Sequence, residues 1–458
     1  MWSIVSANRS TAGAMLGLPS RWNVPKRITL ATVLRQDAVG TRFAHSAFSR
    51  GPEMRRYLAR LLPVVSLIGW LVLGAGPAAA ADRFGPPWMA RVVADRVLIY
   101  QQPDLASGIV GPLERGTVVV VLGEQTDSAA HEWTQTTVGY VLSEGVRETI
   151  DPWVADVIVR NTPVYAKPNA SDAIRLNARE GDLMRVSGVS HGMNGDPNLW
   201  WSTTEGYVAL DALRPSQNPW STLWTVPDGL LALNGWWGAT TTDANVRAGP
   251  STEAPKVGHL PPGNLVKVLV EGPGEDVQGS ATWYRIDGGR YAGGWIHSSI
   301  VKRAAQPRAN TTPPPSGAAS GRWIVVDRSR HSLTLVDNGQ PAFVTYVALG
   351  VAGRETPTGT YSTWGKYRAD DMTSASVRDP GGYYDLPNVP NTQYYLDGGF
   401  AIHGTYWHDD FGTDESHGCV NVTWTDGRYI FSQTLPFVLD GQLTTPTGQP
   451  ATDVVILS

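Results

Sequence analysis

The chain has one cysteine among its 458 residues, Cys419, and it lies in the run Ser-His-Gly-Cys-Val-Asn at positions 416–421. His403 lies sixteen positions earlier, in the run Ile-His-Gly-Thr at 402–405. A thiol is a poor nucleophile until it loses its proton, which a nearby histidine can remove and later return to a leaving amine. A lone cysteine can instead be a small buried hydrophobic residue. The surrounding motif favours the nucleophile.

The residues beside Cys419 offer further groups for acyl-transfer chemistry. The backbone N–H groups around Gly418 and Cys419 can stabilise an oxyanion, because glycine lets the chain approach a substrate closely. The Gly404 carbonyl can orient the His403 ring. His417 competes with His403 for the role of base. If His417 and Cys419 both lie on a strand, we expect His417 to point to the opposite face and to be a structural, orienting or pocket-shaping residue.

Two other groups of polar residues lie nearby in the sequence. Ser416 and Asn421 are predicted to support the site or contact the substrate, although both also fit ordinary turn positions. His408, Asp409 and Asp410 could be interpreted as a metal cluster. Three adjacent ligands do not easily converge on one ion, and no second His/Cys set has ligand spacing. We therefore predict no metal site.

Residues 54–81 have the pattern of a secretory signal peptide. A basic start at 54–60 precedes a mostly apolar run at 61–73 and a small-residue stretch at 74–81. The apolar run is shorter than the roughly 20 residues that a membrane-spanning helix needs. We expect cleavage near Ala80 or Ala81, no stable membrane span afterwards, and a secreted protein located in the cell wall or periplasm.

Two consequences follow from this export signal. We expect Met54 to be the true start, with residues 1–53 a non-native or disordered extension; an Arg-rich transit peptide is the rival interpretation. Cysteines of exported proteins are usually paired in disulfides. Cys419 cannot pair within its own chain, which strengthens its interpretation as a nucleophile.

The composition describes a globular, strand-rich protein. Hydrophobic residues make up 42% and charged residues 17% of the chain. The net charge of −4 gives no excess of positive charge of the kind that binds nucleic acid, so we predict no nucleic-acid partner. The abundance of Trp (18), Gly (49) and Pro (33) predicts many short strands joined by tight turns.

Three stretches, at 90–150, 155–215 and 235–303, repeat one order of signals. In each, a proline is followed thirteen residues later by a glycine (Gly116, Gly181 or Gly263), then by a β-rich run, tryptophan and a closing Gly-aromatic-β-branched triplet. Small β-barrels are typical of such spacing. The third copy resembles a bacterial SH3-like domain, a family whose modules often bind cell-wall peptides or act as spacers. We expect Trp283 and Trp295 to be barrel core rather than ligand platforms.

A Pro/Ser/Ala-rich linker at 304–321 precedes a predominantly β, sandwich-like domain at 322–458. Strands are expected at 323–327, 332–336 and 342–350, with Asp-Asn-Gly at 337–339 as a hairpin turn. One short helix is expected near 424–433. Residues 366–399 are interpreted as a long connection that forms a lid over the thiol, from which Tyr394 or Tyr395 contacts substrate. The predicted fold class is all-β.

Together, the strand pair with its Asp-Asn-Gly turn, the Glu-Thr-Pro-Thr-Gly-Thr-Tyr segment at 355–361, and the two motifs around His403 and Cys419 resemble the YkuD-type L,D-transpeptidase catalytic domain. The resemblance covers about residues 323–457. It implies that His403 is the base, that Cys419 attacks a peptidoglycan stem peptide at its third residue and releases D-alanine, and that an amine of a second stem takes the acyl group. It implies no cofactor.

The sequence leaves several alternatives. An L,D-carboxypeptidase would use the same residues with water as the acceptor. A peptidase of the NlpC/P60 type is disfavoured because its cysteine precedes its histidine in the chain. A non-catalytic wall-binding protein would predict a damaged motif, whereas this motif is intact.

Overall fold

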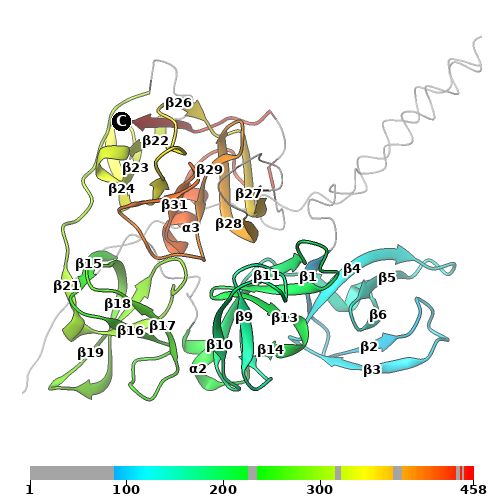
Figure 1. Ribbon diagram of the computed structural model, residues 1–458. Helices are drawn as coiled ribbons and strands as arrows, with labels where there is room; N and C mark the ends of the chain where they lie inside the picture. The colour runs from blue at the N-terminus through cyan, green and yellow to red at the C-terminus, as the bar shows by residue number, and fades with distance from the viewer. Residues whose placement is uncertain (1–86, 225–234, 315–320, 375–383, 440–443, 446–447) are drawn as a thin grey trace, which may run out of the picture. The chain divides into compact units, whose positions relative to one another are not determined.

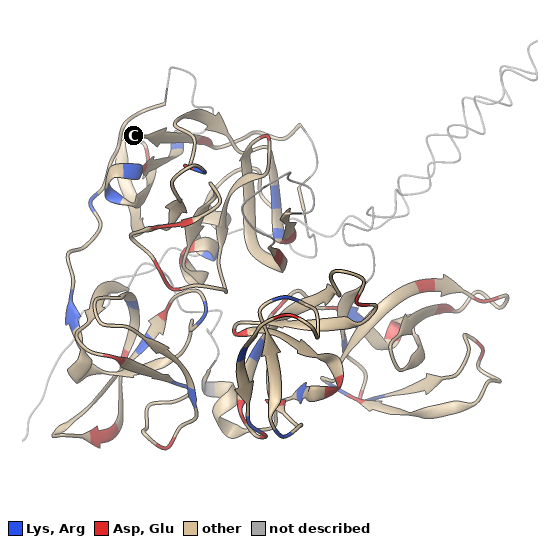
Figure 2. Ribbon diagram, in the orientation of Figure 1, with Lys and Arg blue, Asp and Glu red and all other residues tan. Residues whose placement is uncertain are grey.

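The computed structural model describes residues 87–458 apart from 225–234, 315–320, 375–383, 440–443 and 446–447 (Figure 1). The predicted signal segment, the stretch before it and part of the predicted connection at 366–399 lie outside the described residues. Within them the fold is all-β, as predicted. None of the described helices is long and apolar enough to cross a membrane. Figure 2 shows the positions of basic residues (blue) and acidic residues (red) interspersed over the described elements, in keeping with the small net charge.

The three repeats have one topology. Their seven-stranded sheets run in the orders β3-β2-β6-β5-β4-β1-β7, β10-β9-β13-β12-β11-β8-β14 and β17-β16-β20-β19-β18-β15-β21. These orders are the same permutation of consecutive strands, so the repeats are three copies of one module.

The module strands have the following bounds. The first module has β1 (Trp88–Val92), β2 (Arg96–Tyr100), β3 (Ile109–Glu114), β4 (Val118–Thr126), β5 (Glu132–Thr136), β6 (Gly139–Leu142) and β7 (Val146–Glu148). The second has β8 (Trp153–Val157), β9 (Thr162–Tyr165), β10 (Ile174–Ala178), β11 (Leu183–His191), β12 (Leu199–Thr203), β13 (Gly206–Ala209) and β14 (Leu213–Pro215). The third has β15 (Trp236–Thr240), β16 (Ala244–Arg247), β17 (Lys256–Leu260), β18 (Leu265–Val277), β19 (Ser280–Asp287), β20 (Trp295–His297) and β21 (Val301–Arg303).

The backbone conformation explains why glycine occurs at the equivalent position of each repeat. Gly116, Gly181 and Gly263 have φ of +87°, +88° and +85°, in the left-handed region that only glycine adopts without steric cost. Each lies in the turn that leads into the longest strand of its module, β4, β11 or β18. The thirteen-residue spacing from the proline therefore marks equivalent turns.

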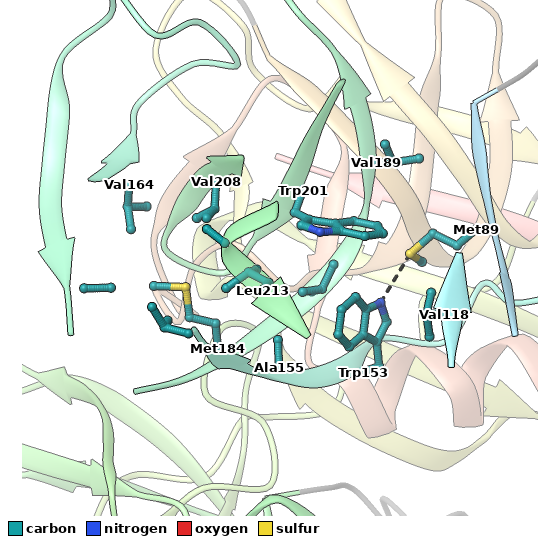
Figure 3. Close-up of a cluster of buried hydrophobic side chains, with 14 of the residues drawn as sticks. Met89, Val118, Trp153, Ala155, Val164, Met184, Val189, Trp201, Val208 and Leu213 are labelled. Carbon is teal, nitrogen blue, oxygen red and sulfur yellow. Dashed lines mark hydrogen bonds between the residues drawn. The ribbon is translucent and has the colours of Figure 1, made fainter. Parts of the chain in front are cut away.

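The module tryptophans are mostly buried, and Trp283 and Trp295 lie in the interior as expected. Figure 3 shows the apolar cluster of the second module, in which Trp153 and Trp201 pack edge to face with ring centroids 5.4 Å apart. Met89 of the first module reaches this cluster, and its sulfur accepts a hydrogen bond from Trp153 Nε1 at 3.4 Å. The first two modules therefore share apolar contacts.

The described residues of the C-terminal domain form two main sheets and one α-helix. One sheet has the order β24-β23-β22-β32-β26, the other β27-β28-β29-β31, and β25 pairs with β30. Their bounds are β22 (Arg322–Asp327), β23 (Ser332–Asp337), β24 (Gln340–Tyr346), β25 (Leu349–Gly350), β26 (Gly359–Ser362), β27 (Gly365–Thr373), β28 (Asp385–Leu396), β29 (Phe400–Gly404), β30 (Asp414–Ser416), β31 (Val420–Val422) and β32 (Asp453–Leu457). The predicted hairpin turn is confirmed, since Asn338 and Gly339 both have positive φ between β23 and β24. The predicted helix is α3 (Trp424–Gln433), whose N-cap Thr423 accepts a hydrogen bond from the Asp426 N–H.

The prediction of a long loop at 366–399 is wrong for most of that stretch. Strands β27 and β28 form an antiparallel pair that runs from Gly365↔Tyr394 to Thr373↔Asp385. Prolines of this stretch, which suggested a loop, lie inside β28, as do Asn388 and Asn391, which both have φ of +55°. These positive φ values fit an irregular strand, which tolerates Pro and Asn that a regular ladder excludes.

The first part of the linker is bound to its neighbours rather than extended in solvent. Gln306 Nε2 donates to the Trp237 carbonyl at 2.8 Å in the third module. Asn310 Nδ2 donates to Asp327 Oδ2 at 2.9 Å in the C-terminal domain. This part of the linker therefore makes defined contacts on both sides.

Candidate active site

A parallel strand pair positions the two residues of the predicted catalytic pair. Strands β29 and β31 align with Ile402 opposite Val420 and His403 opposite Asn421. Cys419 comes one residue before β31, which places it beside the part of β29 that carries His403. Both side chains line one cavity of about 400 Å³. The structure therefore brings together the two residues that the sequence motifs suggested.

His403 is held as a neutral acceptor. Its side chain is 2% exposed, and Nδ1 lies 2.9 Å from the Gly404 carbonyl oxygen. A carbonyl can only accept, so Nδ1 carries the proton and Nε2 keeps its lone pair. Burial lowers the pKa of His403 to about 4, although the Gly404 carbonyl acts in the opposite direction. At neutral pH the ring is uncharged and can take a proton at Nε2.

Cys419 starts as a thiol rather than a thiolate. Part of its side chain reaches the surface, but the protein packed around Sγ raises the pKa of the thiol to about 11, against the effect of the Ala401 N–H. Sγ also lies 3.5 Å from the Gly399 carbonyl oxygen, to which it can donate. The resting pair is thus neutral, and these two pKa values favour proton transfer during attack over a preformed ion pair.

Ser416 braces the turn that carries Cys419. Its Oγ donates to the Cys419 carbonyl at 2.6 Å and accepts from the Gly418 N–H at 3.1 Å. Gly418 has φ of +114°, and a Cβ there would lie 2.6 Å from the Phe400 ring. The turn therefore needs glycine. The Gly418 N–H, suggested above as an oxyanion donor, is already bonded to Ser416 in this structure.

The expectation that His417 faces away from Cys419 is wrong. His417 lines the same cavity, and its ring lies 5.1 Å from that of Tyr384. Residues 417–419 form a bend between β30 and β31 rather than a strand, and residues two apart on a strand would share a face in any case. His417 thus helps to shape the cavity wall.

The other polar residues of the motif have separate positions. Asn421 is buried, lines the cavity and contacts His408 Nε2 through its side-chain amide at 2.9 Å. Asp409 points elsewhere and accepts a hydrogen bond from the Gly289 N–H of the third module at 2.8 Å. Burial raises the pKa of Asp409 to about 7. Asp410 lines the cavity on the exposed side.

Tyr394 and Tyr395 lie on opposite faces of β28 and differ in their surroundings. Tyr394 stacks on Trp364 with centroids 5.3 Å apart, and its hydroxyl donates to Asp370 Oδ2 at 2.9 Å, away from the cavity lining. Tyr395 is 3% exposed, and burial together with the nearby Cys419 raises its pKa. Among the described residues, none makes a hydrogen bond to the buried Tyr395 hydroxyl. Tyr395, not Tyr394, is therefore the one near the thiol.

One wall of the cavity was not predicted from the sequence. Residues of the second module, including Arg175, Thr203, Thr204 and Tyr207, line it together with Arg290 of the third module. These residues belong to barrels of a family whose modules were expected to bind cell-wall peptides or act as spacers. A repeat pattern carries no signal of which module edge faces another domain.

The fold and site define an all-β domain with a cysteine–histidine pair in a cavity, preceded by small β-barrel modules. Residues 321–456 match the family profile described as the L,D-transpeptidase catalytic domain, YkuD, and residues 242–302 match that of the bacterial SH3 domain. The chain therefore carries a YkuD-type L,D-transpeptidase catalytic domain preceded by bacterial SH3-like domains.

Among solved structures, the chain is similar to L,D-transpeptidase 3 from Mycobacterium tuberculosis in complex with a faropenem-derived adduct, with 20% identity and a TM-score of 0.25. That match covers 30% of this chain, which spans 60% of the length of the M. tuberculosis chain. The catalytic domain from E. faecium L,D-transpeptidase matches at 23% identity and a TM-score of 0.25, over 31% of this chain and 100% of that one. The comparison with curated proteins gives no significant match.

Proposed function

We propose that the protein is an exported peptidoglycan L,D-transpeptidase. The observation that carries the proposal is the neutral His403–Cys419 pair, which belongs to the matched YkuD domain and lines one cavity. A peptide that enters this cavity meets a thiol and an unprotonated imidazole nitrogen together. This is the arrangement that acyl transfer from an amide requires.

The acylation half-reaction follows from these positions. Cys419 Sγ attacks the carbonyl carbon of the L-centre at the third stem residue, and the thiol proton passes to His403 Nε2. The tetrahedral intermediate collapses, the bond to D-alanine breaks, and His403 returns the proton to the leaving amine. A thioester to Cys419 remains.

Deacylation repeats the proton path in reverse. An amine of a second stem peptide attacks the thioester carbonyl, His403 takes a proton from the nitrogen, and the Cys419 sulfur leaves and is reprotonated. One amide is broken and one is formed. The reaction needs no oxidant, reductant or cofactor.

The location of the protein belongs to the same proposal. The basic, apolar and small-residue succession at 54–81 supports export, and a peptidoglycan substrate requires a place outside the cytoplasmic membrane. The SH3-like modules would add contacts to the wall. The mature enzyme would act in the cell wall or periplasm.

The test is incubation of the purified protein with a disaccharide tetrapeptide, with intact mass and products recorded and Cys419→Ala as control. A Cys419-dependent acyl adduct with cross-linked dimer is the expected result. Tripeptide without dimer would assign the L,D-carboxypeptidase reaction instead, with water as acceptor. Unchanged tetrapeptide would contradict both enzyme activities.

A further inference from the structure

The second SH3-like module supplies one wall of the cavity that holds Cys419. The tip between β12 and β13 contributes Thr203, Thr204 and Gly206, and Arg175 comes from β10. The catalytic domain alone would leave this side open.

Hydrogen bonds from side chains to backbone carbonyls hold the second module against the catalytic domain. Tyr207 Oη donates to the Asp385 carbonyl at 2.8 Å, and Asn388 Nδ2 donates to the Ser187 carbonyl at 2.9 Å. Gly188 on β11 lies so close to Pro387 on β28 that a Cβ would come within 2.6 Å of the proline ring. Both bonded partners of the module are on β28, which also forms the cavity rim at Asp385.

The tip itself is built rigidly. Thr203 Oγ1 accepts from the N–H groups of Glu205 and Gly206, each at 3.2 Å, and donates to the Gly206 carbonyl at 2.7 Å. Gly206 has φ of +142°, and a Cβ there would lie 2.4 Å from the Tyr165 carbonyl oxygen. The side chains of the tip are therefore presented in one arrangement.

The two arginines on this wall, Arg290 and Arg175, differ in whether their guanidinium groups already have hydrogen-bond partners. Arg290 Nη2 donates a hydrogen bond to the Trp407 carbonyl oxygen at 2.7 Å. Burial raises the pKa of Glu205, and the positive charges of Arg290 and Arg175 act against this shift, Arg290 more strongly. Among the described residues, none forms a hydrogen bond or ion pair with the exposed Arg175 guanidinium. Arg175 therefore keeps its donors available to a ligand.

The catalytic domain contributes the other sign of charge to the cavity lining, through Asp410 and Glu415. A ligand carboxylate is repelled by these two side chains and attracted to the Arg175 guanidinium. A guanidinium matches a carboxylate with two parallel N–H···O bonds, which gives direction as well as attraction.

We propose that the second SH3-like module is part of the substrate site and that Arg175 binds a free carboxylate of a peptidoglycan stem peptide. The identity of the peptide rests on the proposed function. Two sources share this chemistry: the terminal carboxylate of the donor tetrapeptide and a carboxylate of the acceptor stem. In either case the module determines substrate preference in addition to any contact with the wall.

The experiment measures binding without turnover. Cys419→Ala protein is titrated by calorimetry with the tetrapeptide, with its C-terminal amide, and with an acceptor tripeptide, each alone and in combination with Arg175→Gln. Loss of one charge-assisted pair is expected to weaken binding roughly tenfold. A loss that is seen with the tetrapeptide but absent with its amide assigns the donor terminus; a loss with the tripeptide assigns the acceptor.

Arg179→Gln is the matched control, since Arg179 is an exposed arginine of the same module that does not line the cavity. Equal binding of the Arg175 and Arg179 variants to all three peptides overturns the proposal, as does absence of any binding. In the active protein, Arg175→Gln should raise KM and leave kcat unchanged. If the wild-type protein forms no Cys419 adduct but Arg175→Gln still weakens binding, the proposed function fails and the carboxylate site stands.

Discussion

At the scale of residues, the catalytic pair works from an uncharged start. Burial pushes the pKa of His403 down to about 4 and that of the Cys419 thiol up to about 11. Both shifts disfavour the charged form, which is the effect of removing water from each group. The imidazole is then available as a base over a wide range of pH, and the thiol is protected from reaction until a substrate is in place.

The acidic limb of the acylation rate is expected near pH 4, well below the ordinary histidine value of 6.5. Below this limb His403 Nε2 is protonated and cannot take the thiol proton; above it the base form is complete. Rates of acyl-enzyme formation, followed by mass spectrometry from below pH 4 to neutral, check this. His403→Gln should remove the limb and slow acylation by roughly 10²–10⁴-fold. A limb at or above the ordinary histidine value would contradict the lowered pKa of His403.

The buried Tyr395 hydroxyl predicts a conflict between stability and activity. A buried hydroxyl without a partner costs about 1–3 kcal/mol, so Tyr395→Phe should raise the free energy of unfolding. Because Cys419 lies near the phenol, the same change should slow acylation. Tyr394→Phe is the control: its hydroxyl is bonded to Asp370 outside the cavity lining. Denaturant unfolding and acylation rates test both, and equal behaviour of the two variants would contradict the prediction.

At the scale of elements, the bend between β30 and β31 decides where the thiol points. Ser416 joins the two ends of this bend through hydrogen bonds to Gly418 and Cys419. The serine contacts the chain and not the reacting atoms. It therefore acts as a positioning residue.

Ser416→Ala should lower the acylation rate while costing about 1–2 kcal/mol of stability, the sum expected for two ordinary hydrogen bonds. The loss should appear mainly in kcat, because the thiol is misplaced, although Ser416 also lines the cavity. Ser432→Ala, an exposed serine on α3, is the control and should be close to neutral. If Ser416→Ala retained full kcat, the bend would keep its shape without the brace.

Local elements of the fold could be predicted from the sequence, whereas features that depend on distant parts of the chain could not. Short-range signals predicted the hairpin turn at Asn338 and Gly339 and the helix α3, because turn chemistry and capping are local. The strand β28 was missed, because its prolines and asparagines are typical of loops and are tolerated here only through irregular backbone. The module wall was invisible, since Asn388 and Ser187 lie 201 positions apart and only the assembled fold brings them together.

At the scale of the whole molecule, the third module is joined to the catalytic domain through buried charge. Lys267 of β18 forms an ion pair with Asp426 of α3, and both side chains are almost completely buried. Asp287 of β19 accepts hydrogen bonds from Thr423 and Thr425 at the start of the same helix. Burial and the neighbouring Asp426 raise the pKa of Asp287 to about 6, against the effect of Lys267.

This connection reaches the catalytic base through α3. Gly427, one residue after Asp426, packs against the Gly404 backbone, where a Cβ would lie 3.1 Å from the Gly404 Cα. Gly404 in turn orients His403. The module therefore supports the element behind the site and is more than a spacer.

Lys267→Met should destabilise the protein by about 3–5 kcal/mol, because it leaves the Asp426 charge buried without its partner and beside Asp287. The double variant Lys267→Met/Asp426→Leu removes both charges and should recover most of that loss, since an apolar pair of similar size replaces them. Denaturant unfolding of both variants, with Lys302→Met on the exposed strand β21 as control, measures the difference. Recovery of the acylation rate together with the stability would show that the module acts on His403 through α3. If Lys267→Met were as stable as the wild type, the Lys267–Asp426 ion pair would contribute nothing to the interface between the third module and the catalytic domain.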